Sequence, residues 1–145
     1  MKVYLDTCGM QRPLDDQTQI RIRLEAEAVL AIIALVENDK LELVSSEALL
    51  FETQRNTNLT RREFALEILA KAKYSVQVDG DIQTRAKELS TKKFMALDAL
   101  HLASAEAGSA DYFCTCDDKL LKKAGRFCAP TIKAVSPIEL LKEIE

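Results

Sequence analysis

Four acidic residues in this chain stand where a charge is costly, at the edges of apolar segments. Asp6 ends an apolar run, Glu52 and Asp98 interrupt helical apolar segments, and Asp117 follows the apolar stretch 112–116. If folding brings them together, the four negative charges raise each other's pKa unless a cation binds between them. Oxygen-only ligands select Mg²⁺ or Mn²⁺, and the chain has no Cys/His pairs at the spacing of a zinc site. The simplest interpretation is a divalent metal site.

Such a site suggests hydrolysis of a phosphodiester, because a divalent ion acidifies a bound water and stabilises charge on phosphate oxygens. Carboxylates alone repel a nucleic-acid backbone, whereas carboxylates with a metal bound attract it. The net charge of −3 and the pI near 5.3 give no overall basic field, so a polyanion must meet a local patch. The candidate patches, each of which could equally be a solvated helix face, are Arg12 with Arg21 and Arg23; Arg55 with Arg61 and Arg62; Lys92 with Lys93; and Lys119, Lys122, Lys123 and Arg126.

The length and composition favour one domain over residues 1–145. The chain is 48% hydrophobic, and a domain of this size buries about 68–70% of the surface that its unfolded chain exposes. Its cysteines lie in or beside apolar segments without a CxxC pair, which favours a reducing cytoplasm. No apolar run approaches the roughly 20 residues that a membrane span needs. We therefore expect a soluble, cytoplasmic protein. The cysteines are Cys8, Cys114, Cys116 and Cys128.

Short β-favouring segments alternate with helical ones along the chain. This alternation predicts parallel strands joined by crossovers, in an α/β fold: a three-layer α/β/α sandwich around a central, mostly parallel sheet of four to five strands. Ligands bind such sheets beyond the carboxyl ends of the strands, where Asp6 and Asp117 are expected. Strands are predicted at 2–5, 41–44, 74–78, 112–116 and 131–135; helices at about 17–37, 46–55, 60–73, 81–90, 97–107 and 119–124 and from 137 onward; and loops at 7–9 and 11–17.

Capping residues predict where several of the helices begin and end. Asp16 is expected to cap the first long helix, and Ser45 or Ser46 the helix that carries Glu52. Thr60 is expected to cap the helix after it, through a capping box. Gly108 stops the very apolar helix that carries Asp98.

These features, in this order, give the chain a family resemblance that spans nearly its whole length. The helix that begins at Asp98 and the strand ending at Asp117 are the most specific parts, since an Asp after a first strand is common in α/β proteins. The matching segments are Leu5-Asp6-Thr7-Cys8, Arg12-Pro13-Leu14-Asp15-Asp16, Ser46 with Glu52, Leu97-Asp98-Ala99-Leu100-His101-Leu102-Ala103 and Thr115-Cys116-Asp117-Asp118. Together they resemble the PIN domain family.

The resemblance implies one set of acidic residues that binds the metal and catalyses the reaction. Thr115 would hold the adjacent loop or a metal-bound water, and Arg12 would approach the edge of the site. Two positions stay open, because Glu47 could replace Glu52 and Asp118 could share the role of Asp117. The implied set is Asp6, Glu52, Asp98 and Asp117.

The resemblance also implies an activity and partners. PIN domains are metal-dependent nucleases that act most often on RNA, through in-line hydrolysis by a metal-activated water that leaves a 5′-phosphate. Many small members are VapC-type toxins of toxin–antitoxin pairs. The expectation is therefore a Mg²⁺- or Mn²⁺-dependent endoribonuclease, a homodimer with an antitoxin partner and one or two metal ions.

Two other interpretations compete with this one. The first is a non-catalytic PIN-like adaptor or RNA-binding module, although a degenerate site usually lacks one or more of its acids. The second is a phosphoryl-transfer domain, which the residues after the first two predicted strands disfavour. His101, one helical turn from Asp98, is interpreted as a packed histidine whose ring nitrogens find hydrogen bonds, and not as a general acid or base.

Overall fold

The computed structural model describes residues 1–144; Glu145, the last residue of the expected domain, lies outside the described residues. Its centre is a sheet in which all of the described strand pairs are parallel. Five strands in the order β3-β2-β1-β4-β5 confirm the predicted α/β fold. The strands are β1 (Lys2–Leu5), β2 (Glu42–Ser46), β3 (Tyr74–Val76), β4 (Tyr112–Cys114) and β5 (Lys133–Val135).

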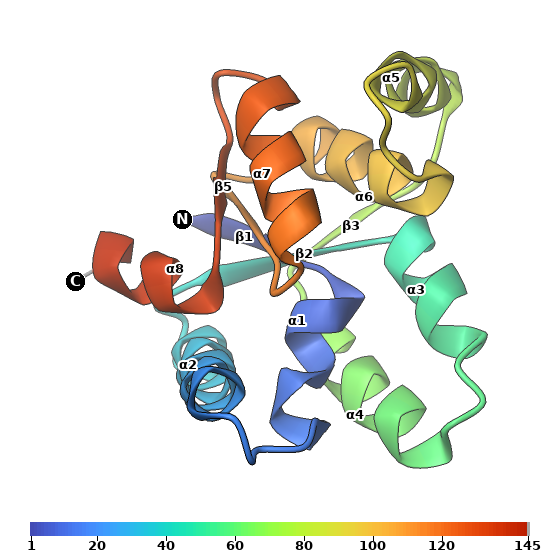
Figure 1. Ribbon diagram of the computed structural model, residues 1–145. Coiled ribbons are helices and arrows are strands. Elements are labelled where there is room, and N and C mark those ends of the chain that lie inside the picture. The colour runs from blue at the N-terminus through green and yellow to red at the C-terminus, as the bar shows by residue number, and fades with distance from the viewer. Residues whose placement is uncertain (145) are drawn as a thin grey trace.

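Helices cover both faces of this sheet. Figure 1 shows α2 and α4 below the strands and α5, α6 and α7 above them, so the three predicted layers are confirmed. The C-terminal helix α8 packs against α2 and β4. The helical elements are α1 (Thr7–Gln11), a 3₁₀ turn (Arg12–Leu14), α2 (Ile20–Glu37), α3 (Glu47–Gln54), α4 (Leu59–Leu69), α5 (Gly80–Ser90), α6 (Ala96–Ala107), α7 (Asp118–Phe127) and α8 (Pro137–Ile144).

Strands β1 and β4 lie side by side at the middle of the sheet and are almost entirely buried. Leu5 at the end of β1 is in register with Cys114 at the end of β4. Tyr4 and Phe113, which lie beside each other on these strands, stack with their ring centroids 5.7 Å apart. The strand order reverses between β1 and β4, and α/β sheets bind their ligands at such a switch point. Asp6 and Asp117 both follow these strands, so the fold places them there.

The segment after β1 is not the predicted loop. Residues 7–11 form the short helix α1, and Asp6 caps it by accepting a hydrogen bond from the backbone N–H of Gly9 at 2.8 Å. A side chain at position 9 would stand 2.7 Å from Leu5 Cδ1 and 3.2 Å from an Asp6 oxygen. Glycine therefore allows the close approach that this cap needs. Helix α1 was not predicted because it is only one short turn and because its cap, Asp6, is itself a candidate site residue.

Two of the predicted helix caps are wrong. The long helix α2 begins at Ile20 after Gln19, and Asp16 instead accepts a hydrogen bond from the backbone N–H of Thr18 in the preceding turn. The cap of α4 is Asn58, two residues before the predicted Thr60. In both places several residues with capping side chains lie close together, so local propensity did not single one out. The predicted cap Ser46 of α3 is confirmed.

Two further properties of the described residues concern membrane-spanning helices and cysteines. Within residues 1–144, no helix has the length and apolar character that crossing a membrane requires. All four cysteines are free thiols, and two of them, Cys114 and Cys116, are buried.

Candidate active site

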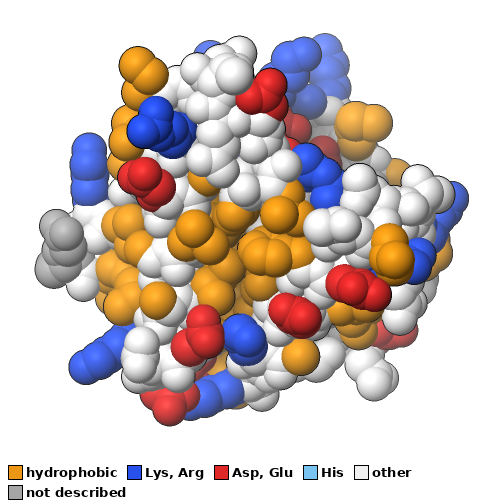
Figure 2. Space-filling view, turned by 90° about the horizontal axis from the view of Figure 1, so that it is seen from below, with side chains coloured by type: hydrophobic (Ala, Val, Ile, Leu, Met, Phe, Trp, Pro, Cys, Tyr) orange, Lys and Arg blue, Asp and Glu red, His pale blue; other side chains and the backbone are white. Residues whose placement is uncertain are grey.

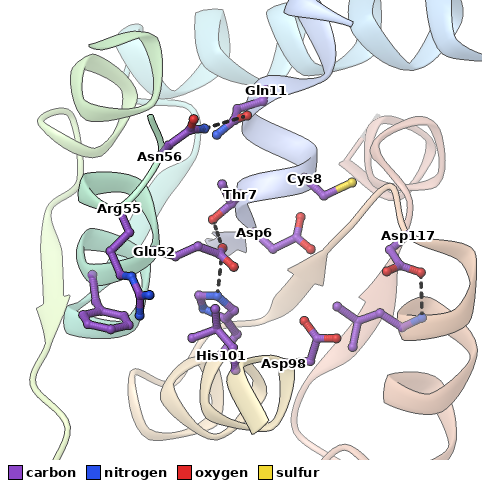
Figure 3. A pocket seen from close by; sticks show the side chains of 13 residues that line it. Asp6, Thr7, Cys8, Gln11, Glu52, Arg55, Asn56, Asp98, His101 and Asp117 are labelled. Atoms are coloured by element: carbon purple, nitrogen blue, oxygen red, sulfur yellow. Dashed lines mark hydrogen bonds and ion pairs between the residues drawn. The ribbon is translucent and has the colours of Figure 1, made fainter. Parts of the chain in front are cut away.

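A pocket of about 430 Å³ opens beyond the carboxyl ends of β1 and β4. Four carboxylates from four elements line it: Asp6 follows β1, Glu52 lies on α3, Asp98 lies on α6, and Asp117 caps α7. Figure 3 shows these carboxylates around one common space. The structure therefore brings together all four acids that the sequence selects.

Asp6 is the most deeply buried of the four, with only 4% of its surface exposed. One carboxylate oxygen accepts from the Gly9 N–H, and the other accepts from the Thr115 hydroxyl at 2.6 Å. Burial raises the pKa of Asp6 to about 6, although these hydrogen bonds act in the opposite direction. The carboxylate is thus held by neutral donors and lacks a cation of its own.

Thr115 also explains how the loop after β4 keeps its shape. Its hydroxyl donates to Asp6 and accepts from the backbone N–H of Asp117 at 3.1 Å. One side chain therefore fixes the acids at the ends of both central strands. Thr115, expected to hold the loop or a metal-bound water, thus contacts both the loop and Asp6.

Glu52 is oriented by two donors. It accepts a hydrogen bond from the Thr7 hydroxyl and another from Nε2 of His101 at 3.2 Å. Burial by itself would raise the pKa of Glu52, but the hydrogen bonds from His101 and Thr7 and the electrostatic effect of His101 together outweigh it, and the pKa lies below its ordinary value. The alternative acid, Glu47, is exposed, does not line the pocket and accepts from the backbone N–H of Val78.

A buried hydrogen-bond chain runs from Glu52 into the core. His101 is 1% exposed, and its Nδ1 lies 2.7 Å from the hydroxyl of Tyr4, which lies 2.7 Å from the hydroxyl of Ser46. Since ionised Glu52 can only accept, Nε2 of His101 donates to it, and in the neutral ring Nδ1 then accepts from Tyr4. Tyr4 then accepts from Ser46, which accepts in turn from the Leu49 N–H. Every polar side-chain atom of His101, Tyr4 and Ser46 therefore has a hydrogen-bond partner, and Glu52 is held in one orientation.

Asp98 and Asp117 face the pocket from the opposite side. Burial, together with the charges of Asp117 and Glu52, raises the pKa of Asp98. Asp117 uses one oxygen to accept from the backbone N–H groups of Lys119 and Leu120, which leaves its other oxygen free for a ligand. Its neighbour Asp118 is exposed, is paired with Arg21 and does not line the pocket.

The donor set fits a hydrated hard cation. Among residues 1–144, no three His, Cys, Asp or Glu side chains stand close enough together to hold a metal ion as they lie. Mg²⁺ does not need such a cage, because it keeps several waters and binds proteins through one or two carboxylates. None of the ion pairs formed by the described residues includes Asp6, Asp98 or Asp117. The pocket therefore offers unneutralised oxygen ligands across a space wide enough for an ion with its waters.

Arg12 lies outside the pocket lining, although it was expected at the site edge. Its guanidinium donates to Asp15 and Glu25. The one arginine that does line the pocket is Arg55, whose guanidinium carbon lies 5.0 Å from the centre of the Phe51 ring. The sequence showed Arg55 only as one member of a candidate basic patch.

Sequence reasoning also missed several polar residues of the pocket. Thr7 and Gln11 belong to the unpredicted helix α1, and Asn56 follows α3. Among the described residues, the buried amide nitrogen of Gln11 has no hydrogen-bond partner. Tyr4 could have been found only by noticing that a strand buried on both faces carries one hydroxyl.

The fold and the pocket define a class, namely a three-layer α/β domain with four carboxylates at its switch point. The family model described as PIN domain matches residues 14–126, a span that includes Glu52, Asp98 and Asp117 and begins after Asp6. The chain belongs to the PIN domain family, whose members are generally nucleases. No curated protein matches the chain by sequence.

Two solved structures share this fold at low sequence identity. One is VapBC2 from Rickettsia felis bound to a DNA fragment from its promoter, with a TM-score of 0.54, 15% identity and coverage of 94% of this chain and 98% of that one. The other is PAE2754 from Pyrobaculum aerophilum, with a TM-score of 0.56, 13% identity and coverage of 99% and 95%. Both likenesses extend over nearly the full length of each chain.

Proposed function

We propose that this protein is a Mg²⁺- or Mn²⁺-dependent endoribonuclease. The observation that carries the proposal is the convergence of Asp6, Glu52, Asp98 and Asp117 on one pocket, where none of the ion pairs formed by the described residues includes Asp6, Asp98 or Asp117. Residues that held only structural roles would be expected to be paired, because a buried unpaired charge is costly. Membership of a family of nucleases supports the same conclusion.

The roles of the residues follow from their contacts. Asp6, Asp98 and Asp117 would hold the ion, and Glu52, fixed by Thr7 and His101, would complete the ligand set. A bound ion would acidify water and neutralise charge on the scissile phosphate. Arg55 stands at the pocket wall, where its guanidinium can contact a phosphate of the bound strand.

The primary test is cleavage of single-stranded and structured RNA by the purified full-length chain. Activity should require Mg²⁺ or Mn²⁺, stop in EDTA, and fall in Asp98→Asn by at least about a thousand-fold, because several kcal/mol of stabilisation are lost. Cleavage that persists without metal and in Asp98→Asn would overturn the proposal. A parallel reaction with single-stranded DNA reports whether the activity is restricted to RNA.

Two matched pairs of variants test the site assignment itself. Glu52→Gln should abolish cleavage while Glu47→Gln leaves it intact, since only Glu52 lines the pocket. Asp117→Asn should abolish cleavage while Asp118→Asn leaves it intact. Asparagine remains a good helix cap, so Asp117→Asn removes charge without removing the cap of α7. Equal losses within either pair would show that the change acts through stability.

We further propose that the nuclease is the cytoplasmic toxin of a toxin–antitoxin pair and forms a homodimer. The structural likeness to VapBC2 supports the antitoxin, and the free cysteines support a reducing compartment. Figure 2 shows hydrophobic side chains gathered on the face where α2 and α4 lie, and Ile20, Leu24 and Leu30 of α2 are each at least half exposed. Such patches favour a protein partner.

These partners can be tested apart from catalysis. Light scattering on the purified chain should give the mass of a dimer. If an adjacent gene encodes a small DNA-binding protein, co-expression with that protein should relieve growth arrest and yield a stable complex. A monomer that does not bind the neighbouring gene product would instead favour a stand-alone nuclease, or an adaptor if cleavage is also absent.

A further inference from the structure

Six cationic side chains line a groove of about 400 Å³ beside the acidic pocket. They come from two segments, the turn at residues 91–95 and one stripe of α7, and the ring of Phe127 also lines the groove. On α7 the cations occupy positions 119, 122, 123 and 126, the spacing that puts side chains on one helical face over about 10 Å. This basic groove consists of Lys92, Lys93, Lys119, Lys122, Lys123 and Arg126.

The cations of the basic groove are left without acidic partners. No carboxylate among residues 1–144 forms an ion pair with any of the six, whereas Arg12, Arg21, Arg61, Arg85, Lys73 and Lys133 are each paired. One lysine is instead held by the backbone, since Lys123 Nζ donates to the carbonyl of Lys93 at 2.7 Å. The six cations therefore form a local positive patch in a chain of net charge −3. Such a patch attracts an anion from outside the protein.

Both walls of the basic groove lead directly to acids of the site. The turn at 91–95 continues into α6, which carries Asp98 in its first turn, and α7 begins at its cap Asp117. The positive charge of Lys123 acts on Asp98, whose pKa it lowers against the larger effect of burial. Leu120 of α7 lines the pocket, while the neighbouring Lys119 lines the groove. The groove is therefore adjacent to the catalytic pocket.

The backbone conformation at Lys93 allows the role of this residue to be tested. Lys93 has φ 68°, a left-handed conformation that suits glycine and is strained for a residue with a side chain. Glycine here would relieve the strain, yet the chain carries a lysine that faces the groove. Asp39 and Ser109, which also lie just after helices, have the same conformation, so the strain can be removed separately at a position inside the groove and at one outside it.

We propose that the basic groove binds the phosphodiester backbone of the RNA strand whose scissile phosphate lies in the acidic pocket. The inference rests on the proposed nuclease function and names the surface by which that same site holds its substrate. Clustered Lys and Arg bind a strand by displacing its counterions, independently of sequence. Phe127 adds an aromatic ring between Lys92 and Arg126, whose charged groups lie 5.8 and 5.3 Å from its centre. A basic groove with an aromatic surface is typical of sites for single strands.

The first test measures RNA binding without cleavage. A short fluorescein-labelled single-stranded RNA is titrated with full-length protein carrying Asp98→Asn, in EDTA, by fluorescence anisotropy at salt concentrations from about 50 to 200 mM. Adding Lys119→Ala and Lys122→Ala should weaken binding on the order of ten-fold. It should also reduce the slope of log affinity against log salt by about 1.4, or about 0.7 for each phosphate that is no longer neutralised.

The matched control removes the same charge elsewhere. Lys40 and Lys142 are exposed lysines outside the groove, so Lys40→Ala with Lys142→Ala lowers the net charge equally. This control should keep the affinity and the salt slope of the parent. If both pairs of substitutions weaken binding equally, only overall charge matters and the groove assignment is wrong.

The second test separates binding from folding. Lys93→Gly removes a cation and relieves backbone strain, so it should melt at or above the temperature of the parent yet bind RNA less tightly. Ser109, with φ 56° beyond the other end of α6, provides the control. Ser109→Gly should be equally or more stable than the parent and bind RNA unchanged. Unweakened binding in Lys93→Gly would overturn its role in the groove.

The two proposals fail in different ways. If the protein cleaves RNA with metal but the groove variants bind and cleave like the parent, the nuclease assignment stands and the groove assignment falls. If no variant cleaves RNA but binding still depends on the groove, the surface assignment stands and the catalytic one falls.

Discussion

Two buried carboxylates, Glu25 on α2 and Asp6 after β1, are treated in opposite ways by this fold. Glu25 is 2% exposed and accepts from Nε and Nη2 of Arg12 at 3.0 and 2.9 Å, with Arg21 at 3.6 Å from its other oxygen. Asp6 is 4% exposed and has only the neutral donors Gly9 and Thr115. Among residues 1–144, Arg12 and Arg21 supply the counter-charge for Glu25, and no residue forms an ion pair with Asp6.

This difference separates structural acids from site acids. A paired buried carboxylate already has what its charge requires, and losing the partner leaves an uncompensated charge inside the protein. An unpaired one keeps an unfavourable charge that an external cation can relieve. The same contrast distinguishes Asp117, which is unpaired in the pocket, from Asp118, which is paired with Arg21 outside it.

The largest expected effect is on stability, at the paired carboxylate. Arg12→Ala leaves Glu25 buried with only the more distant Arg21, and should lower the free energy of unfolding by about 3–5 kcal/mol. Urea denaturation measures it. Arg21→Ala is the control and should cost far less, because Arg21 is exposed and exposed ion pairs contribute little.

A double variant sharpens this prediction. Arg12→Met combined with Glu25→Leu replaces the buried pair with apolar side chains, and should recover most of the stability that Arg12→Ala loses. If the double variant is as unstable as the single one, the segment needs the arginine for another reason, such as its contact with Asp15.

The next effect is metal-dependent stabilisation, at the unpaired carboxylate. Mn²⁺ at about 100 times its dissociation constant should stabilise the protein by about 2.7 kcal/mol, a rise in melting temperature of roughly 5–11 °C for a chain of this size. The rise should disappear in Asp6→Asn. Glu25→Gln should melt at a lower temperature and still show the full rise, because it disturbs only the paired acid. If Glu25→Gln also loses the rise in melting temperature, the conclusion that only Asp6 of the two carboxylates belongs to the metal site is wrong.

A smaller effect is expected at the histidine that orients Glu52. His101→Asn can keep an acceptor for Tyr4 but cannot reach Glu52, and should lower the rate of RNA cleavage by about 10–100-fold, as for other partners of metal ligands. His101→Gln can place an N–H near the position of Nε2 and should retain more activity. A rescue by Gln and not by Asn, in variants of matched melting temperature, identifies a positioning role. Equal losses of cleavage rate in the two variants would show that His101 acts only through packing.

The sequence revealed the acids better than the contacts that hold them. Asp98 and Asp117 could be predicted because each is a carboxylate at the boundary of a strongly apolar segment, and the alternation of elements fixed the edge of the sheet on which they meet. The choice between Glu52 and Glu47 could not be made, because it depends on how far α3 runs into the pocket. Periodicity does not report that distance.

Two further misses have the same physical origin. Helix α1 is one short turn, and its cap, Asp6, is also a candidate site residue. Asp6 was therefore interpreted only as a metal ligand, and its role as a helix cap was missed. Arg12 was expected near the site because of the family resemblance, but its partner Glu25 lies 13 residues away on the next helix. Pairings between elements are tertiary facts, and neither propensity nor spacing encodes them.

The smallest expected effect is a stabilisation caused by losing function. Asp98 is half-buried, its pKa is raised by burial and by Asp117 and Glu52, and no hydrogen bond to its carboxylate forms among the described residues. Asp98→Asn should therefore raise the stability of the metal-free protein by up to about 1 kcal/mol, as is common when site residues are neutralised. Thermal melting in EDTA measures the change.

The control for this variant is an acid that also lies in the first turn of a helix but is outside the site. Asp81 lies in the first turn of α5 and is exposed, so Asp81→Asn removes only the favourable interaction of a carboxylate with a helix N-terminus and should lower stability slightly. Opposite signs for the two variants in EDTA would show that the pocket opposes the charge of Asp98 more than the helix favours it. With Mn²⁺ present the order should reverse, because wild type gains the bound ion and Asp98→Asn does not. A destabilised Asp98→Asn in EDTA would mean that the charge of Asp98 is already compensated within the protein, and that it belongs with Glu25 and not with Asp6.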